Sequence, residues 1–271
     1  GSEMCIRDSP GSERDHAGVP FALTEEFVSV YRMHPLLPDT IQFRRLSDDD
    51  VVGEPVKLED TLREKSRPSF VDKGLSIPDI FYSMGVAHPG ALALQNYPEF
   101  LRKLTIPPGE APNGSNQQEV VDLGAIDVLR DRERGVPRYN EFRRLLRLKP
   151  FSSFDEMTDN PDLVKELKEV YKEGGVEKVD LLVGTLAEKP IDGFGISETA
   201  FRIFLLMAPR RLRSDRFFTN DYTPRIYSQA GLDWINNNDM TSVLIRHYPQ
   251  LKPKLWRTKN PFKPWQEAAQ V

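Results

Sequence analysis

The strongest constraint on the fold is a helical pattern that recurs along the chain and is interrupted by prolines and glycines. Apolar residues follow helical spacing over residues 121–134, 139–148, 181–189, 197–212 and 240–247. Asn160 followed by Pro161 predicts one more helix, over residues 161–171. No convincing alternation of apolar and polar residues, as a half-buried strand requires, accompanies them. The chain also has 22 prolines, which end or break helices outside the first turn. The sequence therefore predicts a mainly α protein, one domain or part of one, with long connecting loops.

Charge and hydropathy exclude two classes of protein. The 271 residues carry 37 basic and 41 acidic side chains, so the net charge of -4 provides no global basic field that would attract nucleic acid. The longest apolar runs are far shorter than the roughly 20 residues of a membrane-spanning helix. We therefore expect neither a nucleic-acid partner nor a transmembrane segment.

The two ends of the chain differ from its middle. Residues 1–18 lack apolar periodicity and the hydrophobic stretch of a signal peptide, and their string "EMCIRDS" resembles translated sequencing-adapter read-through. We interpret them as a non-native leader, which includes the only cysteine, Cys5, and also His16. A domain is expected over residues 19–251. Residues 252–271 are expected to form a tail. Its basic and aromatic residues are also compatible with a peripheral membrane contact.

One short string, "YRMHPLLPD", places a phenol three residues before an imidazole. Phe27, Val30, Tyr31 and His34 are spaced to share one face of a helix that Pro35 should end. Side chains three positions apart on a helix are neighbours. Spacing alone favours a packed core in which the histidine is structural. A neutral imidazole can also bind haem iron, and a tyrosine beside haem can be oxidised to a radical.

The longer string "EFVSVYRMHPLLPD" closely resembles the proximal-histidine helix of the animal haem peroxidase and cyclooxygenase superfamily. Its dioxygenase branch has a tyrosine three residues before the haem-binding histidine, whereas ordinary peroxidases keep only the histidine. The resemblance implies haem b as cofactor, His34 as the proximal iron ligand and Tyr31 as the radical carrier. It also implies that Phe27 lies near the haem or the substrate.

A second string, "RDRERGVPRYNEFRRLL", is similar to the arginine-rich segment of the superfamily that ends in a Tyr-Asn pair. The resemblance implies that Asn140 accepts a hydrogen bond from His34 and so fixes its orientation and tautomer. The charged residues 130–134 fit a solvated helix end as well. That alternative does not account for Asn140.

A third string, "ISETAFRIFLLMAPRRLRSDRFF", combines an apolar helix with four arginines where the helix should end. Cations are favoured at a helix C-terminus whatever their function, but a guanidinium also holds a carboxylate through two hydrogen bonds. The segment is similar to that of plant-type fatty-acid α-dioxygenases. The resemblance implies that Arg211, or else Arg210, binds the substrate carboxylate, and that Arg216 lies near the haem or the substrate.

Together with "NYP", "DLLVG" and "GFGISETAF", these strings resemble α-dioxygenases over residues 20–251. The resemblance implies the C-terminal part of an all-helical haem peroxidase-like domain that acts on a fatty acid and dioxygen. Tyr31, oxidised with equivalents from peroxide, would remove a hydrogen atom from the α-carbon, and dioxygen would add there to give a 2-hydroperoxy fatty acid. The rival interpretations are a mid-chain oxygenase of cyclooxygenase or diol-synthase type, a plain haem peroxidase and a non-catalytic helical module.

The same resemblance places the distal haem histidine, and any calcium site, upstream of the proximal helix. The expected partner is accordingly the N-terminal half of the same polypeptide, and the chain alone is expected not to be a competent enzyme. The sequence assigns no cellular compartment.

Overall fold

The computed structural model describes residues 23–62, 66–110, 116–172, 174–255, 258, 260–262 and 265. The leader assigned to residues 1–18, with Cys5 and His16, lies outside the described residues, as does most of the tail. The described chain is mainly helical, which confirms the predicted class. It divides into two compact units, the first of residues 1–36 and 91–227 and the second of residues 37–90 and 228–271.

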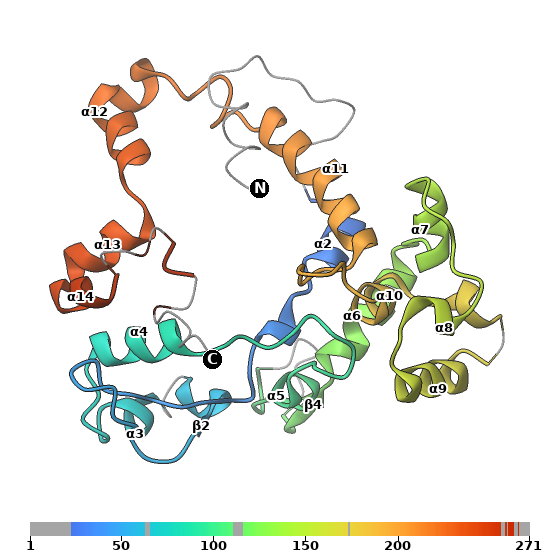
Figure 1. Cartoon of the computed structure of the whole chain (residues 1–271), viewed down its shortest axis with the longest axis horizontal. Coiled ribbons are helices and arrows are strands. Elements are labelled where there is room, and N and C mark those ends of the chain that lie inside the picture. The colour runs from blue at the N-terminus through green and yellow to red at the C-terminus, as the bar shows by residue number, and fades with distance from the viewer. Residues whose placement is uncertain are drawn as a thin grey trace. The chain divides into compact units, whose positions relative to one another are not determined.

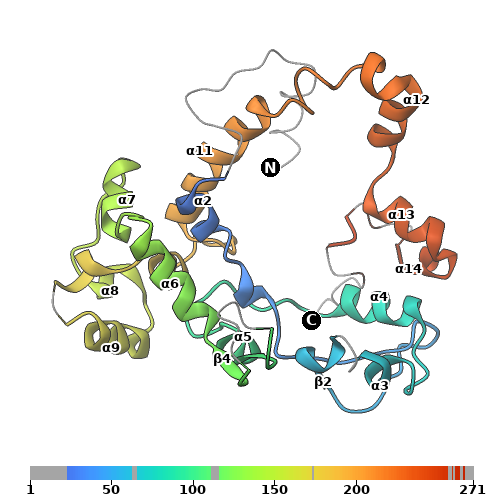
Figure 2. The same ribbon diagram turned by 180° about the vertical axis from the view of Figure 1, so that it is seen from behind.

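The first unit contains most of the helices (Figures 1 and 2). Its elements are α2 (Glu25–Val30), a 3-10 helix (His34–Leu36), α5 (Glu99–Arg102), β3 (Leu104–Ile106), β4 (Glu119–Val121), α6 (Leu123–Glu133), α7 (Tyr139–Leu145), α8 (Phe154–Met157), α9 (Pro161–Val170), a 3-10 helix (Gly175–Lys178), α10 (Leu181–Ala187) and α11 (Glu198–Ser214). α2 packs against α6, α10 and α11, and α10 also packs against α7.

Local sequence signals set the ends of these helices. The Asn160 side chain accepts hydrogen bonds from the backbone N–H groups of Asp162 and Leu163, at 3.0 and 3.2 Å, and Pro161 follows at the first helical position. The Ser197 hydroxyl caps α11 in the same way. These caps explain why the predicted helices 161–171 and 197–212 begin where the sequence placed them.

The core of the first unit gathers around α7, α9 and α10. Tyr139 is fully buried there, and its ring lies directly over Gly184 of α10. A Cβ atom added at Gly184 would lie 2.2 Å from the Tyr139 ring, so only a glycine allows this approach. The "DLLVG" string thus has a packing reason for its last residue.

Two small antiparallel sheets are present, although the sequence showed no strand pattern. β3 pairs with β4, with Leu104 opposite Val121, and in the second unit β1 (Thr40–Ile41) pairs with β2 (Val56–Lys57). Each strand has only two or three residues, too few for alternation to be visible in the sequence. The prediction of no strands was wrong for these two ladders.

The second unit is smaller. Its remaining elements are a 3-10 helix (Leu58–Thr61), α3 (Ser66–Phe70), α4 (Ile77–Val86), α13 (Met240–His247), a 3-10 helix (Pro249–Leu251) and α14 (Lys252–Leu255). Ser76 and Asp79 form a capping box at the start of α4. α12 (Pro224–Asn237) was not predicted, and Ser228, with φ 60°, divides it at the boundary between the units. No helix in the described part of the chain has the length and hydropathy to span a bilayer.

Candidate functional site

The predicted helix that would carry Tyr31 and His34 on one face is shorter than expected. α2 ends at Val30, Tyr31 is its C-cap residue, and His34 begins a separate 3-10 helix. Pro35 is a cause, because it has no N–H to bond the carbonyl of Tyr31 four residues earlier, and its ring clashes with that carbonyl in a continuous helix. The two candidate residues therefore lie at consecutive turns of the chain rather than on one helical stripe.

Tyr31 is part of an aromatic group. Its ring centroid lies 4.7 Å from that of Phe27 and 6.0 Å from that of Phe204, which comes from α11. Phe27 is buried, while Tyr31 remains 47% exposed. The phenol is thus held by packing on its ring and is still accessible to a reacting molecule.

The His34 side chain is partly buried and contacts a tyrosine and an aspartate. The hydroxyl oxygen of Tyr97 lies 3.2 Å from Nδ1 of His34, and Oδ2 of Asp127 lies 4.0 Å from the same nitrogen. Burial lowers the pKa of His34 below its usual value, although the Asp127 carboxylate acts in the opposite direction. The imidazole is therefore favoured in its neutral form, which is the form that binds a metal.

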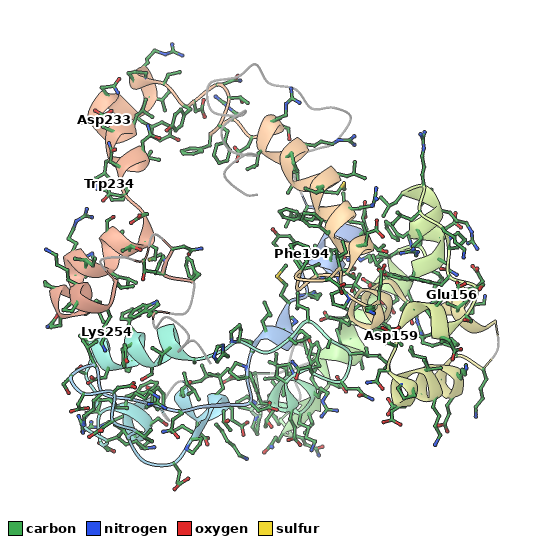
Figure 3. All side chains as sticks on the ribbon, viewed as in Figure 1. Glu156, Asp159, Phe194, Asp233, Trp234 and Lys254 are labelled. Carbon is green, nitrogen blue, oxygen red and sulfur yellow. The ribbon has the colours of Figure 1, made fainter. Side chains whose placement is uncertain are left out.

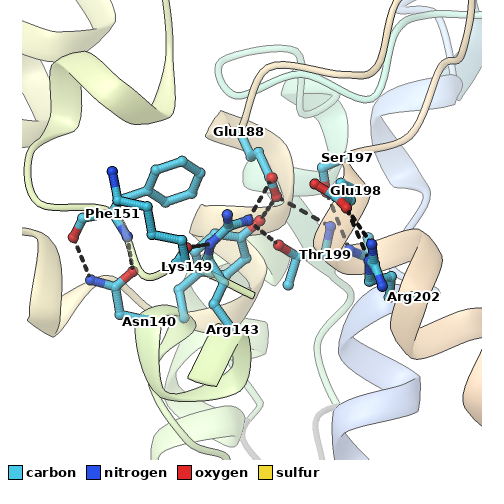
Figure 4. A network of polar contacts seen from close by, with 11 residues as sticks. Asn140, Arg143, Lys149, Phe151, Glu188, Ser197, Glu198, Thr199 and Arg202 are labelled. Atoms are coloured by element: carbon cyan, nitrogen blue, oxygen red, sulfur yellow. Dashed lines mark hydrogen bonds and ion pairs between the residues drawn. The ribbon is translucent and has the colours of Figure 1, made fainter. Parts of the chain in front are cut away.

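The predicted hydrogen bond between His34 and Asn140 is not formed, and this expectation is corrected. Asn140 is fully buried, and its amide donates to the backbone oxygen of Phe151 at 2.9 Å (Figure 4). The same amide nitrogen donates to Oε1 of Glu177, also at 2.9 Å. Its Oδ1 accepts from the backbone N–H of Phe151, also at 2.9 Å. Asn140 thus joins the start of α7 to the loop at Phe151 and to Glu177, and no described hydrogen bond connects it to His34.

Arg211 is the buried member of the arginine cluster. It is 5% exposed, and it donates to the backbone oxygen of Met207 at 3.1 Å and to the Thr24 hydroxyl at 3.2 Å. Its Nε is buried and has no hydrogen-bond partner among the described residues. Desolvation lowers the pKa of Arg211 from its usual value. A buried cation with an unused donor is suited to an anionic ligand.

The two other arginines of the prediction differ from Arg211. Arg210 is exposed, and Arg216 is exposed and forms an ion pair with Asp221 at 3.1 Å. The guanidinium of Arg211 lies 5.0 Å from the ring centroid of Phe27, whose ring packs against Tyr31. The structure therefore brings Arg211, Phe27 and Tyr31 together.

Charged residues of α6 fix α2 in place. Arg130 donates through two nitrogens to Glu25, at 2.7 and 3.0 Å, and the Ser29 hydroxyl donates to Asp131 at 2.6 Å. Asp131 is buried, so the solvated-end alternative is wrong for it, whereas Arg130 is exposed although it pairs with Glu25. Their contacts hold the helix that leads into Tyr31.

Sequence reasoning missed three residues that surround the candidate site. Tyr97 and its neighbour Asn96, whose amide donates to the backbone oxygen of Pro35 at 3.0 Å, both contact the turn at His34. Asp127, on α6, is 3% exposed. The "NYP" string was the available signal for the first two. For Asp127 no signal was available, because it is one of three acidic residues in α6 and no local pattern distinguishes it.

His34 fits the requirements for an iron ligand. Its Nδ1 is engaged by Tyr97, and no described residue forms a hydrogen bond with its Nε2. A ligating histidine typically uses one ring nitrogen for the metal and the other for a hydrogen bond of this kind. The described residues contain no group of three or more His, Cys, Asp or Glu side chains that could hold a metal ion. The calcium site, expected upstream, stays a prediction.

Comparison with known proteins agrees with this geometry. The family model described as animal haem peroxidase matches residues 7–261. The chain belongs to the animal haem peroxidase family. Alpha-dioxygenase 2 of Arabidopsis thaliana is 44% identical over 259 residues, which cover 93% of this chain and 40% of that protein.

Two solved structures of this family are also similar. A crystal structure of fatty acid alpha-dioxygenase from Arabidopsis thaliana has a TM-score of 0.84 at 39% identity, over 97% of this chain and 41% of that one. An Oryza sativa fatty acid alpha-dioxygenase variant, solved with palmitic acid, has a TM-score of 0.84 at 38% identity, over 96% of this chain and 43% of that one. The chain thus spans about 40% of the length of these relatives.

Proposed function

We propose that the chain forms the proximal-histidine side of a haem-dependent fatty-acid α-dioxygenase. The observation that carries this proposal is the succession of Arg211, Phe27 and Tyr31, in which a buried cation with an unused donor lies one aromatic ring away from an accessible phenol. Six curated relatives that are 42–44% identical over 92–94% of the chain are named alpha-dioxygenases, and an Oryza sativa fatty acid alpha-dioxygenase that is 38% identical was solved with palmitic acid.

In this proposal, Nε2 of His34 binds the haem iron. The bound haem supplies one-electron oxidation, by which Tyr31 is converted to a tyrosyl radical. The neutral imidazole favoured by burial has a lone pair for this bond. Packing of the Tyr31 ring against Phe27 and Phe204 holds the phenol in one orientation while its edge stays accessible.

Arg211 binds the carboxylate of the fatty acid. A row of aromatic side chains continues from Tyr31 to Phe204, then to Phe201 at 6.3 Å and to Phe194 at 4.7 Å between ring centroids (Phe194 is labelled in Figure 3). From Phe201 to Arg211 the helix rises about 15 Å, which is comparable with a long acyl chain. The acyl chain would lie along this row, because apolar surface on both partners is then removed from water.

Anchoring at Arg211 determines which carbon reacts. With the carboxylate held beside Phe27, the α-carbon is the first carbon that faces Tyr31. The phenoxyl oxygen of Tyr31 takes a hydrogen atom from that carbon, so the phenol is restored and the carbon keeps the unpaired electron. Dioxygen adds to this carbon, and a hydrogen atom returned by the Tyr31 hydroxyl gives the 2-hydroperoxy acid and the tyrosyl radical again.

A chimera tests the proposal. In Arabidopsis alpha-dioxygenase 2, the matching segment is replaced by residues 19–251 of this chain, and palmitic acid is supplied with dioxygen. Mass spectrometry should detect 2-hydroperoxypalmitic acid or its decarboxylated aldehyde, and Tyr31→Phe should abolish both while the Soret absorbance persists. Arg202→Gln is the matched control, because Arg202 is an exposed residue of α11 that pairs with Glu198.

Two results would contradict the proposal. Oxygen on a mid-chain carbon of linoleic acid would indicate the cyclooxygenase or diol-synthase type of chemistry instead. A haem-loaded chimera in which Tyr31→Phe keeps its full activity would exclude Tyr31 as the radical carrier.

A further inference from the structure

Three side chains of the first unit form a continuous row that begins at the candidate iron ligand, His34. Nδ1 of His34 lies 3.2 Å from the hydroxyl oxygen of Tyr97, and that hydroxyl lies 3.3 Å from Oδ2 of Asp127. The rings of His34 and Tyr97 have centroids 5.4 Å apart at an interplanar angle of 45°. A phenol is therefore placed between the imidazole and a carboxylate.

The number of protons in this row fixes the direction of both hydrogen bonds. A tyrosine hydroxyl has one proton to donate, and a carboxylate can only accept. The Tyr97 proton must therefore point to Asp127, because otherwise two oxygen lone pairs would face each other at 3.3 Å. The Tyr97 oxygen is then left as an acceptor, and the group that can donate to it is an N–H at Nδ1 of His34.

Neighbouring contacts hold the carboxylate and the phenol in place. Asp127 is 3% exposed, and its other oxygen, Oδ1, forms an ion pair with Arg32 at 3.1 Å. This ion pair holds the carboxylate in position. Asn96 donates to the backbone oxygen of Pro35 and so fixes the turn next to His34. The row is thus supported at both ends.

We propose that Tyr97 and Asp127 form a relay that keeps His34 in the tautomer protonated at Nδ1, with the lone pair of Nε2 directed to a ligand. Tyr97 and Asp127 are positioning residues, since they act through His34. The role of Nε2 as the iron ligand rests on the proposed function. The tautomer preference itself depends only on the three side chains of this chain.

The relay also replaces the hydrogen bond expected from Asn140. Asn140 forms its hydrogen bonds with Phe151 and Glu177, and none of the described bonds joins it to His34. A phenol backed by a carboxylate is a stronger acceptor than an isolated phenol, because the carboxylate polarises the O–H bond. The Nδ1–H bond to such an acceptor increases the basicity of Nε2.

Nitrogen NMR of the chain, without haem, tests the relay. Long-range ¹H–¹⁵N spectra, recorded at about pH 8 where an ordinary imidazole is neutral, distinguish a protonated ring nitrogen from an unprotonated one. His34 is assigned by its loss in His34→Gln. We expect Nδ1 to be the protonated nitrogen of His34, and Tyr97→Phe to shift His34 toward the tautomer protonated at Nε2.

Matched variants separate the relay from general packing. Tyr171→Phe removes another hydroxyl that donates to an aspartate, Asp180 at 2.8 Å, and should leave the His34 spectrum unchanged. Asp127→Asn should weaken the tautomer preference without removing Tyr97, and this variant gives a second reading if Tyr97→Phe does not fold. Haem affinity, measured by titration, should fall about 10- to 100-fold in Tyr97→Phe, as for other losses of such a partner.

Two outcomes would overturn the relay. One is a wild-type His34 that is protonated at Nε2 or is an equal mixture of tautomers. The other is an unchanged His34 spectrum in folded Tyr97→Phe. Failure of the chain to bind haem, with the tautomer as expected, would instead contradict the proposed function and leave the relay intact.

Discussion

Arg211 and Thr24, which are 187 positions apart in the sequence, are joined by a hydrogen bond from Nη2 of the guanidinium to the threonine hydroxyl at 3.2 Å. Thr24 lies at the N-cap position of α2, but its side chain makes no capping hydrogen bond. The Thr24 hydroxyl instead accepts the hydrogen bond from Arg211. It fixes the end of α11 against the start of the helix that leads to Tyr31.

Replacement of Arg211 by glutamine should impair capture of the fatty acid. The variant keeps a polar side chain but loses the charge that would pair with the carboxylate, and a hydrogen bond to a charged group contributes about 1.5–3 kcal/mol. In the chimera we expect kcat/KM for palmitic acid to fall about 10- to 100-fold. Steady-state oxygen uptake at varied palmitic acid concentration measures this change.

Arg202→Gln, on the same helix, provides the control for Arg211→Gln and should leave kcat/KM unchanged. Hexadecanol, which lacks a carboxylate, should not distinguish Arg211→Gln from the unmodified chimera. Equal loss of activity toward palmitic acid in both variants would indicate damage to α11 rather than loss of a carboxylate contact.

Replacement of His34 by alanine should remove the iron ligand. Hemin titrated into the 271-residue chain should give a Soret band characteristic of histidine ligation, and His34→Ala should abolish it. Added imidazole should restore the band in His34→Ala, because the cavity left by the side chain accepts the free ligand. His247→Ala is the control, since His247 is an exposed residue at the end of α13. An unchanged band in His34→Ala would contradict the ligand assignment.

The helices of the first unit could be predicted because their signals are local. Asn160 followed by Pro161, and Ser197 before an apolar stripe, begin helices whatever the rest of the chain does. Tyr97 and Asp127 could not be predicted as partners of His34, since they are 63 and 93 positions from it and meet only through tertiary packing. Asn140 was assigned by resemblance, and its amide bonds Phe151 in the loop after α7 and Glu177 in the 3-10 helix Gly175–Lys178.

Residue type and burial together distinguish Arg211 from the other arginines near the end of α11. Four arginines near the end of α11 have the same chemistry in the sequence, and the sequence named Arg211 with Arg210 as its alternative. In the structure Arg211 is buried and Arg210 is exposed. The burial of Arg211 depends on its contact with α2, and no local sequence pattern reveals that contact.

Replacement of Asp180 by asparagine should make stability less dependent on pH. Asp180 is 2% exposed, and although burial raises its pKa, hydrogen bonds from Arg132 and Tyr171 and the charge of Arg138 lower it overall. The folded pKa lies below the unfolded value of about 3.9, so the stabilisation is present above about pH 4 and is lost as the pH falls through the folded pKa. Because both arginines are partly exposed, we expect a loss of about 1–2 kcal/mol at neutral pH.

Urea unfolding followed by circular dichroism at several pH values measures the effect of Asp180→Asn. The difference in free energy of unfolding between the two proteins should be largest near pH 7 and should shrink below about pH 4. Asp155→Asn is the control, because Asp155 pairs with Lys168 at an exposed position of the same unit. A difference that stays constant down to acid pH would show that Asp180 stabilises the fold by packing rather than by charge.

Replacement of Arg143 by methionine should be the most destabilising of these changes. Arg143 donates to Glu188 at 2.8 Å and to Thr199 at 2.9 Å inside the first unit, and Tyr139 donates to the same glutamate (Figure 4). Both members of the ion pair are buried, at 8% and 7% side-chain exposure, so the variant leaves a buried carboxylate without its cation. Loss of one partner of such a pair costs about 3–5 kcal/mol.

A double variant distinguishes this cause from a loss of volume around Arg143. Arg143→Met combined with Glu188→Gln removes the buried negative charge while the glutamine still accepts from Tyr139, so part of the lost stability should return. We expect the double variant to be more stable than Arg143→Met alone, as measured by the midpoint of urea unfolding. Equal or lower stability of the double variant would mean that the Arg143 side chain acts through its packing on the Phe151 ring, which lies 3.9 Å from the guanidinium carbon.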